Sequence, residues 1–172
     1  MIASPSFTGI YSYMADEFNR LRTRARLAQL LSKVLGKRNG LKSLAYSYTL
    51  DLRNKQNLGI RNIPIDSIIG TMGRNTDFDG KFRPLKTHLL DRWVNNYLLL
   101  ESNGWGPILV HKYGDEYFVE DGHHRVSVAK FVGVVYIEAE VWDHSYAQSP
   151  GPACVRNRPA VRKSTEVFSA SS

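Results

Sequence analysis

Two histidines and an arginine follow one another at His123, His124 and Arg125, directly after the pair Asp121 and Gly122. Arginine presents a planar fork of N–H donors that matches phosphate oxygens, and a histidine ring can add one more donor. Asp-Gly is a turn signal, and it separates a short β-favouring run at 117–119 from apolar residues at helical spacing. We therefore expect Asp121 to cap a helix whose first turn attracts an anion. The predicted phosphate-binding residues are Asp121, Gly122, His123, His124 and Arg125.

The elements around this turn are readable from the same stretch. Val126, Ala129 and Val132 predict a helix that ends at Gly133, a residue suited to the left-handed position after a helix. Alternating apolar residues at 135–142 then predict a strand with one buried face. A purely structural reading stays open, in which Asp121 only caps, Gly122 only turns and the histidines only pack.

Two further carboxylates lie in the segment at 70–84, which has many turn formers and little periodicity, so we expect a loop. Asp77 and Asp79 are two residues apart there. They could hold Mg²⁺ or act as a base, although an Asp- and Gly-rich turn often has no other role.

The motif DGHHRVSVAKFVG, with the following IEAEV, resembles the signature of the ParB/sulfiredoxin superfamily. The resemblance covers residues 63–142 and includes IPID at 63–66, NGWGPILV at 103–110 and a hairpin around Gly114. It implies a small α+β domain, a mixed sheet with helices, whose GxxR turn binds the phosphates of ATP or CTP, with Mg²⁺ as a companion of the nucleotide. The residue before the arginine is the histidine that sulfiredoxins share, so we expect His124 to contribute more than His123. Protonation would strengthen its hydrogen bond, so affinity should rise as pH falls.

Departures from the family narrow the activity. Sulfiredoxins carry their nucleophilic cysteine where this chain has His123, so their thiolate chemistry is excluded. Chromosome-partitioning ParB proteins usually have Glu-Arg-Arg at 123–125 and continue into a helix-turn-helix, which the residues after 142 do not resemble. We therefore expect a nucleotide-dependent regulatory or DNA-associated module.

Two enzyme alternatives stay open. Free serine kinases of the superfamily resemble this turn more closely, but they need a carboxylate base, for which Asp77 and Asp79 are the candidates. A ParB-like nuclease would need metal ligands from Glu120, Asp121, His123 or His124, beside an arginine that repels the cation.

The net charge of +7 belongs to the ends of the chain. Residues 1–42 carry eight basic and two acidic residues, whereas 43–142 carry eleven and twelve. Apolar residues at three- and four-residue steps predict an amphipathic helix over 16–35 that ends at Gly36. Its cations could dock on the domain, contact DNA phosphates or meet an anionic membrane, and docking on a second copy would make a homodimer. They are Arg20, Arg22, Arg24, Arg26, Lys33, Lys37 and Arg38.

The chain is expected to divide into a basic helical extension (1–58), a nucleotide-binding domain (59–143) and a disordered tail (144–172). Further predictions are a second helix over 41–52, an edge strand over 60–65, a helix over 85–101, and strands at 108–113 and 117–120.

Composition points to a cytoplasmic protein. Cys154 is the single cysteine, so disulfide frameworks and cysteine zinc sites are excluded. The sequence has no apolar run of about 20 residues, the length that spans a bilayer, and its first residues lack a secretory pattern.

Overall fold

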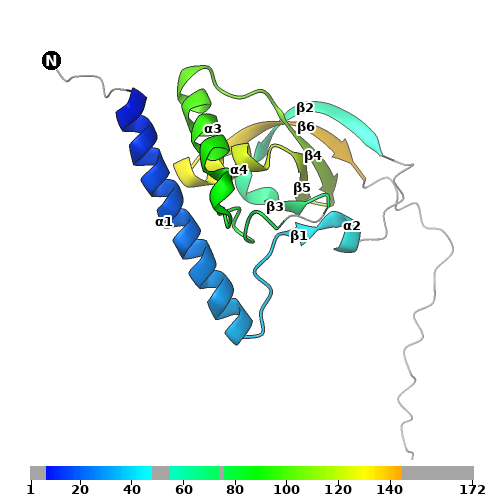
Figure 1. Ribbon diagram of the computed structural model, residues 1–172. Helices are drawn as coiled ribbons and strands as arrows, with labels where there is room; N and C mark the ends of the chain where they lie inside the picture. Colours follow the sequence, from blue (N-terminus) through cyan, green and yellow to red (C-terminus); the bar gives the residue numbers. More distant parts are fainter. Residues whose placement is uncertain (1–6, 48–54, 74–75, 145–172) are drawn as a thin grey trace, which may run out of the picture.

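The chain forms a mixed six-stranded sheet with helices on one side and a long N-terminal helix outermost (Figure 1). The computed structural model describes residues 7–47, 55–73 and 76–144. The helices are α1 (Phe7–Val34), α2 (Leu44–Ser47), α3 (Leu90–Ser102) and α4 (His123–Val132), with short 3-10 turns at Ile65–Ser67 and Thr87–Leu89. The strands are β1 (Lys42–Ser43), β2 (Gln56–Pro64), β3 (Ile68–Thr71), β4 (Ile108–Tyr113), β5 (Glu116–Asp121) and β6 (Tyr136–Asp143). The expected α+β class with a helical N-terminal extension is confirmed.

The sheet runs in the order β1, β3, β5, β4, β6, β2. β4 and β5 form the predicted antiparallel hairpin, while β3 pairs with β5 and β4 pairs with β6 in parallel. β2 lies at one edge, as Pro64 predicts, because proline cannot donate to a second neighbour. In β6 the side chains of Ile137, Ala139 and Val141 are buried, as the predicted alternation requires, whereas Val135 precedes the strand and is exposed.

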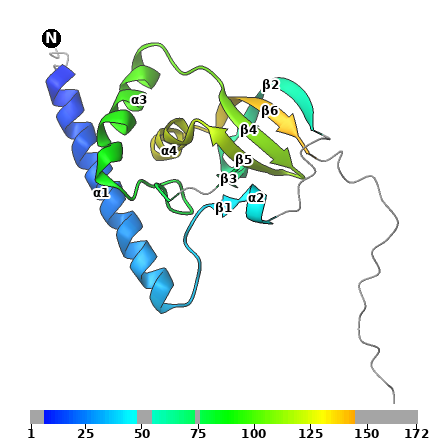
Figure 2. The same cartoon turned by 45° about the vertical axis from the view of Figure 1, so that its right-hand side comes forward.

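Helices follow one another outward from the sheet in the order α4, α3, α1 (Figure 2). Val126 and Ala129 of α4 pack into the core beneath the sheet. On the other side of α4, Val128 joins a second core with Trp93 of α3 and Phe18 of α1. α4 is therefore buried on two faces, which fixes its N-terminal turn relative to the sheet.

The N-terminal extension is packed into the fold. Met14 and Phe18 of α1 are fully buried against α3, with the Phe18 ring 5.8 Å from that of Trp93. β1 pairs with β3 at the edge of the sheet. Residues assigned to the extension thus complete both a core and the sheet.

Two sequence predictions near this extension need correction. α1 begins at Phe7, earlier than the expected residue 16, and ends before Gly36 as predicted. The expected helix over 41–52 is wrong at its start, because Lys42–Ser43 is a strand and α2, Leu44–Ser47, begins later. The cause is tertiary: a Cβ on Gly70 would lie 2.2 Å from the Lys42 carbonyl oxygen, so glycine allows a strand to approach there.

Helix α3 begins at Leu90, later than the predicted residue 85. Leu85 instead donates its N–H to the Asp77 carbonyl at 2.8 Å, which ties it to the preceding loop. That loop follows β3, which includes Gly70 and Thr71. Residues 48–52 of the predicted second helix and residues 145–172 of the predicted tail lie outside the described residues. Within the described part of the chain, none of the helices has the length and apolar character to span a bilayer.

Candidate functional site

The turn between β5 and α4 is built on Gly122, which is the residue that caps α4. Its φ is 103°, and a Cβ there would lie 2.5 Å from Cγ2 of Ile108. The predicted cap, Asp121, is wrong because this residue ends β5, and no side chain caps the helix. The first intrahelical bond runs from the Val126 N–H to the Gly122 carbonyl at 3.0 Å. The backbone N–H groups of the three residues before Val126 therefore precede the helix ladder and are available to an anion.

Arg125 closes this turn as a clamp. Its Nη1 donates to the carbonyl oxygens of Gly106 and Pro107, both at 2.9 Å, and its Nη2 donates to Asp121 at 2.7 Å. These bonds use three of the five N–H groups of a guanidinium, which leaves Nε–H and one Nη2 hydrogen. Arg125 thus holds the segment before β4, and it could offer a phosphate only the remainder of its fork.

His123 joins the turn to β3. Its Nε2 lies 2.8 Å from the Thr71 hydroxyl, and that hydroxyl lies 3.1 Å from the Val119 carbonyl oxygen. Because a hydroxyl carries one hydrogen, donation to the carbonyl assigns the His123 hydrogen to Nε2. The ring stacks on Phe78 at 6.3 Å and 14°. Burial lowers the pKa of His123, so the ring is held neutral.

His124 lies edge-on to the same phenylalanine, with ring centres 5.3 Å apart. Its Nδ1 is buried and has no hydrogen-bond partner among the described residues. Burial, followed by the charge of Arg92, lowers the pKa of His124 to about 4. The ring is therefore neutral above pH 5.5, and this removes the basis for expecting its protonation to raise affinity at mildly acidic pH.

The two loop aspartates have different surroundings. Asp79 is fully buried, and one oxygen accepts from Nε and Nη2 of Arg83 at 2.8 and 2.5 Å. Its other oxygen accepts the backbone N–H groups of Lys81 and Arg83. Both oxygens therefore hold the loop together. Asp77 is partly exposed and pairs with Lys86 at 2.6 Å. Burial lowers the pKa values of His123 and His124, and the charge of Asp77 opposes part of that lowering.

These carboxylates do not make a protein-held magnesium site. Across residues 7–47, 55–73 and 76–144, no three His, Cys, Asp or Glu side chains gather as metal ligands. The candidate metal ligands of a nuclease, Glu120, Asp121, His123 and His124, therefore do not form such a group either.

The cations of the basic helix do not gather at the turn. Arg22 donates to the Thr87 hydroxyl, Arg26 donates to the Leu85 carbonyl at 3.3 Å, and Arg20 pairs with Glu17. The first two contacts hold α1 against the segment before α3, so part of the basic cluster serves docking. The side chains of Arg24, Lys33, Lys37 and Arg38 are exposed.

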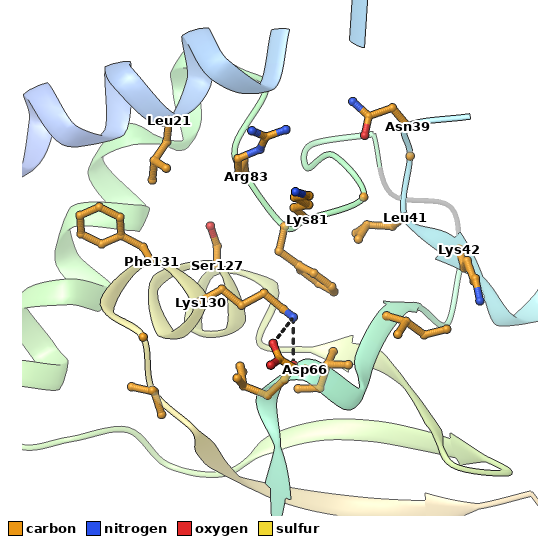
Figure 3. Close-up of a pocket in the computed structure, with 18 of the residues that line it drawn as sticks. Leu21, Asn39, Leu41, Lys42, Asp66, Lys81, Arg83, Ser127, Lys130 and Phe131 are labelled. Atoms are coloured by element: carbon orange, nitrogen blue, oxygen red, sulfur yellow. Dashed lines mark hydrogen bonds and ion pairs between the residues drawn. The ribbon is translucent and has the colours of Figure 1, made fainter. Parts of the chain in front are cut away.

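A cavity of about 1740 Å³, which sequence reasoning missed, lies beside α4 (Figure 3). Ser127, Lys130 and Phe131 of α4 form one wall. Lys130 donates to the Ile65 carbonyl at 2.9 Å, and burial lowers its pKa. The opposite wall comes from α1, the segment at 38–43 and the loop that carries Lys81 and Arg83. None of the residues at 121–125 lines this cavity, whose parts are too far apart in sequence to form a motif.

The sequence reading also missed Thr71 and Phe78. Thr71 ends an apolar strand beside the turn, so its position was a usable signal. Phe78 is buried in a loop without periodicity, and only the fold brings it against both histidines.

A second histidine pair lies under the far end of β4. Nδ1 of His111 is 2.7 Å from Nε2 of His144, and Nε2 of His111 contacts Glu120. Both rings are buried, so the pair joins β4, β5 and the residue after β6.

Comparison with known proteins found no relative: no family model and no curated protein matches the chain. The candidate site is therefore defined by its own residues, which are the β5–α4 turn with Thr71, Phe78 and Asp77 beside it.

Proposed function

We propose that the chain is a nucleotide-binding module of the ParB/sulfiredoxin type, in which the β5–α4 turn receives the phosphates of ATP or CTP. One observation carries the proposal. α4 begins at a left-handed glycine, without a side-chain cap, so three consecutive backbone N–H groups are directed out of the helix. Helix starts of this kind bind phosphate because unpaired donors and the positive end of the helix dipole coincide.

The side chains around the turn support the same ligand. His124 has a nitrogen without a partner, and a neutral ring with its hydrogen on Nδ1 would donate to a phosphate oxygen. His123, by contrast, already uses Nε2 with Thr71. The expectation that His124 contributes more than His123 is therefore kept, without the dependence on pH.

Magnesium would accompany the triphosphate as part of the ligand. Asp79 cannot hold the ion, since both of its oxygens are engaged inside the loop. Asp77 is the loop carboxylate whose charge acts on both histidines.

Calorimetry with ATP, CTP and GTP, with and without Mg²⁺, tests the proposal. Arg125→Ala should weaken binding by roughly 2 to 3 kcal/mol if the rest of its fork meets a phosphate. His124→Gln should weaken binding more than His123→Gln. Absence of binding by the folded wild type for all three nucleotides would refute the proposal.

We propose a regulatory role, in which the nucleotide is bound and turned over slowly or not at all, with the protein in the cytoplasm. DNA association through the α1 cations stays a prediction, and the α1 variants described below test it.

A small-molecule kinase is the second candidate, and the position of Asp77 favours it. This carboxylate is partly exposed, pairs with Lys86, and its charge acts on both histidines of the proposed phosphate site, so it is the available base. Labelled ATP with a panel of hydroxyl-bearing metabolites separates the two functions. A kinase transfers the γ-phosphate and loses this activity in Asp77→Asn, with Asp115→Asn as the control, whereas a regulatory module transfers none.

A further inference from the structure

The C-terminal turns of α1 expose an apolar face. It consists of Leu27, Leu30, Leu31, Val34 and the adjoining Leu35, whose exposed fractions run from 56% to 84%. Steps of three and four residues place these side chains on one side of the helix. The buried residues Met14, Phe18 and Ala25 lie on the other side, against the domain. We call the five exposed residues the α1 apolar face.

Cations flank this face on both sides. Arg24 precedes Leu27 by three residues and Lys33 follows Leu30 by three, so each is the helical neighbour of one edge. Lys37 and Arg38 follow the end of the helix. Between Phe18 and Leu50 the sequence has no Asp or Glu. Arg24, Lys33 and Lys37 also make no ion pair with the described residues.

This part of the helix extends past α3 in both views (Figures 1 and 2). Its outer side is therefore accessible to a broad surface as well as to a narrow ligand.

We propose that the α1 apolar face inserts into the surface of a membrane that contains anionic lipids. Leucine and valine side chains would enter the boundary between headgroups and acyl chains, which removes their apolar surface from water. The long side chains of Arg24, Lys33 and Lys37 would reach outward to lipid phosphates. Each such cation contributes about 1 kcal/mol at an anionic surface.

A second copy of the chain fits this face less well, because the charges repel. An antiparallel pair centred between Leu30 and Leu31 would place Arg24 of one helix beside Lys37 of the other. A parallel pair would place every cation beside its own counterpart. Like charges in contact oppose both arrangements.

Two other occupants are disfavoured by composition. Residues 145–172 carry four basic residues and one acidic residue, so their charge does not complement the cations of α1. A DNA backbone would satisfy the cations, but it would leave the five apolar side chains in water.

Flotation with lipid vesicles tests the proposal with the full chain. Binding to vesicles of phosphatidylcholine mixed with phosphatidylglycerol should be at least about tenfold tighter than to phosphatidylcholine alone, and salt should weaken it. Leu27→Ser combined with Leu31→Ser should abolish binding, whereas Leu99→Ser, an exposed leucine of α3, should not. Lys33→Gln with Lys37→Gln should remove most of the preference for anionic vesicles, with Arg61→Gln as the charge control.

Circular dichroism and thermal unfolding establish that each variant is folded. Nucleotide binding is therefore not needed as evidence of folding, and the vesicle test is independent of the proposed function. Equal affinity for the two vesicle types, or none, overturns the proposal. If the wild type instead dimerises in sedimentation equilibrium and the leucine variant does not, without vesicle binding, the face belongs to a second copy. If duplex DNA binds and only the lysine variant weakens it, again without vesicle binding, the cations belong to DNA.

Discussion

The pattern Asp-Gly-x-x-Arg occurs twice in this chain, as DGKFR at 79–83 and as DGHHR at 121–125. In both places the aspartate and arginine form an ion pair, at 2.5 Å in the first and 2.7 Å in the second. The backbones differ. The first copy is a closed loop in which Phe82 has a φ of 59°, and the second is a left-handed glycine followed by a helix.

The two copies of the pattern also differ in which member of the ion pair is buried. In the loop, the aspartate is the centre, because Asp79 is fully buried and accepts from the arginine and from two backbone N–H groups. At the helix, the arginine is the centre, because Arg125 donates to two carbonyls while the Asp121 side chain is 68% exposed. The same five-residue pattern therefore yields either a carboxylate-centred or a guanidinium-centred clamp, and the neighbouring elements decide which.

Removing the buried carboxylate should have the largest effect on stability. Asp79→Ala should lower the free energy of unfolding by about 3–5 kcal/mol, because it leaves Arg83 and two backbone donors without their acceptor. Asp121→Ala should cost no more than about 1 kcal/mol, since an exposed partner is easily replaced by water. Urea denaturation measures both. Similar losses in the free energy of unfolding for the two alanine variants would contradict the difference between the two copies.

The next largest difference is expected between the stability costs of replacing the two glycines of the pattern. Gly122→Ala combines a left-handed residue with a Cβ 2.5 Å from Ile108, and should cost about 2–4 kcal/mol. At Gly80 the nearest atom to an added Cβ would be the Gly40 carbonyl oxygen at 3.3 Å, so Gly80→Ala should cost less than about 1 kcal/mol. Thermal unfolding of the two variants compares them directly. A loss of stability in Gly122→Ala as small as that in Gly80→Ala would mean that the β5–α4 turn can rearrange to accept a Cβ.

Loss of the Arg125 clamp should affect stability less than loss of Asp79. Arg125→Ala should lower the free energy of unfolding by about 1 kcal/mol, because Asp121, Gly106 and Pro107 are exposed enough to bond to water instead. Chemical denaturation measures this value on the protein used for nucleotide titration. A cost as large as that of Asp79→Ala would show that the second clamp is the more important one.

A further effect should be a dependence on pH that only the second copy carries. The pKa of His124 is lowered in the folded protein, so below the ordinary histidine pKa the unfolded chain binds a proton that the folded chain does not. The free energy of unfolding should thus fall as pH decreases from about 6.5 towards 4. His124→Gln should reduce that fall. Urea midpoints at pH 7.5 and pH 5 check the difference, and an unchanged slope in His124→Gln would assign the effect to other groups.

Sequence patterns were sufficient where local signals and tertiary packing agree. The β4–β5 hairpin, the end of α4 at Gly133, the alternation of β6 and the edge position of β2 were all predictable from period, turn residues and proline. Sequence patterns failed where a residue far away in the sequence determines the local structure. Lys42 and Ser43 form a strand because Gly70 lies opposite, and Leu85 lies outside helix α3 because it bonds to Asp77.

The candidate site shows the same limit. The order of Asp121 to Arg125 located the turn, but the cap moved by one residue because Gly122 alone fits against Ile108. The role of Asp79 was hidden because its arginine partner is four residues away in a loop without periodicity. The basic cavity could not be predicted, since it forms only when α1, the loop and α4 meet.

The order of strands also has a consequence for synthesis on the ribosome. β2 is at the sheet edge, and Ile63 pairs with Ile137 of β6. At elongation rates of about 5–20 residues per second, β2 therefore waits for several seconds before its partner strand exists. During that time a segment with Ile60 and Ile63 has an unsatisfied backbone on both sides, which is the kind of strand that chaperones bind and that aggregates when they are absent. Nascent chains that stop before Tyr136 should therefore be the aggregation-prone products of this gene.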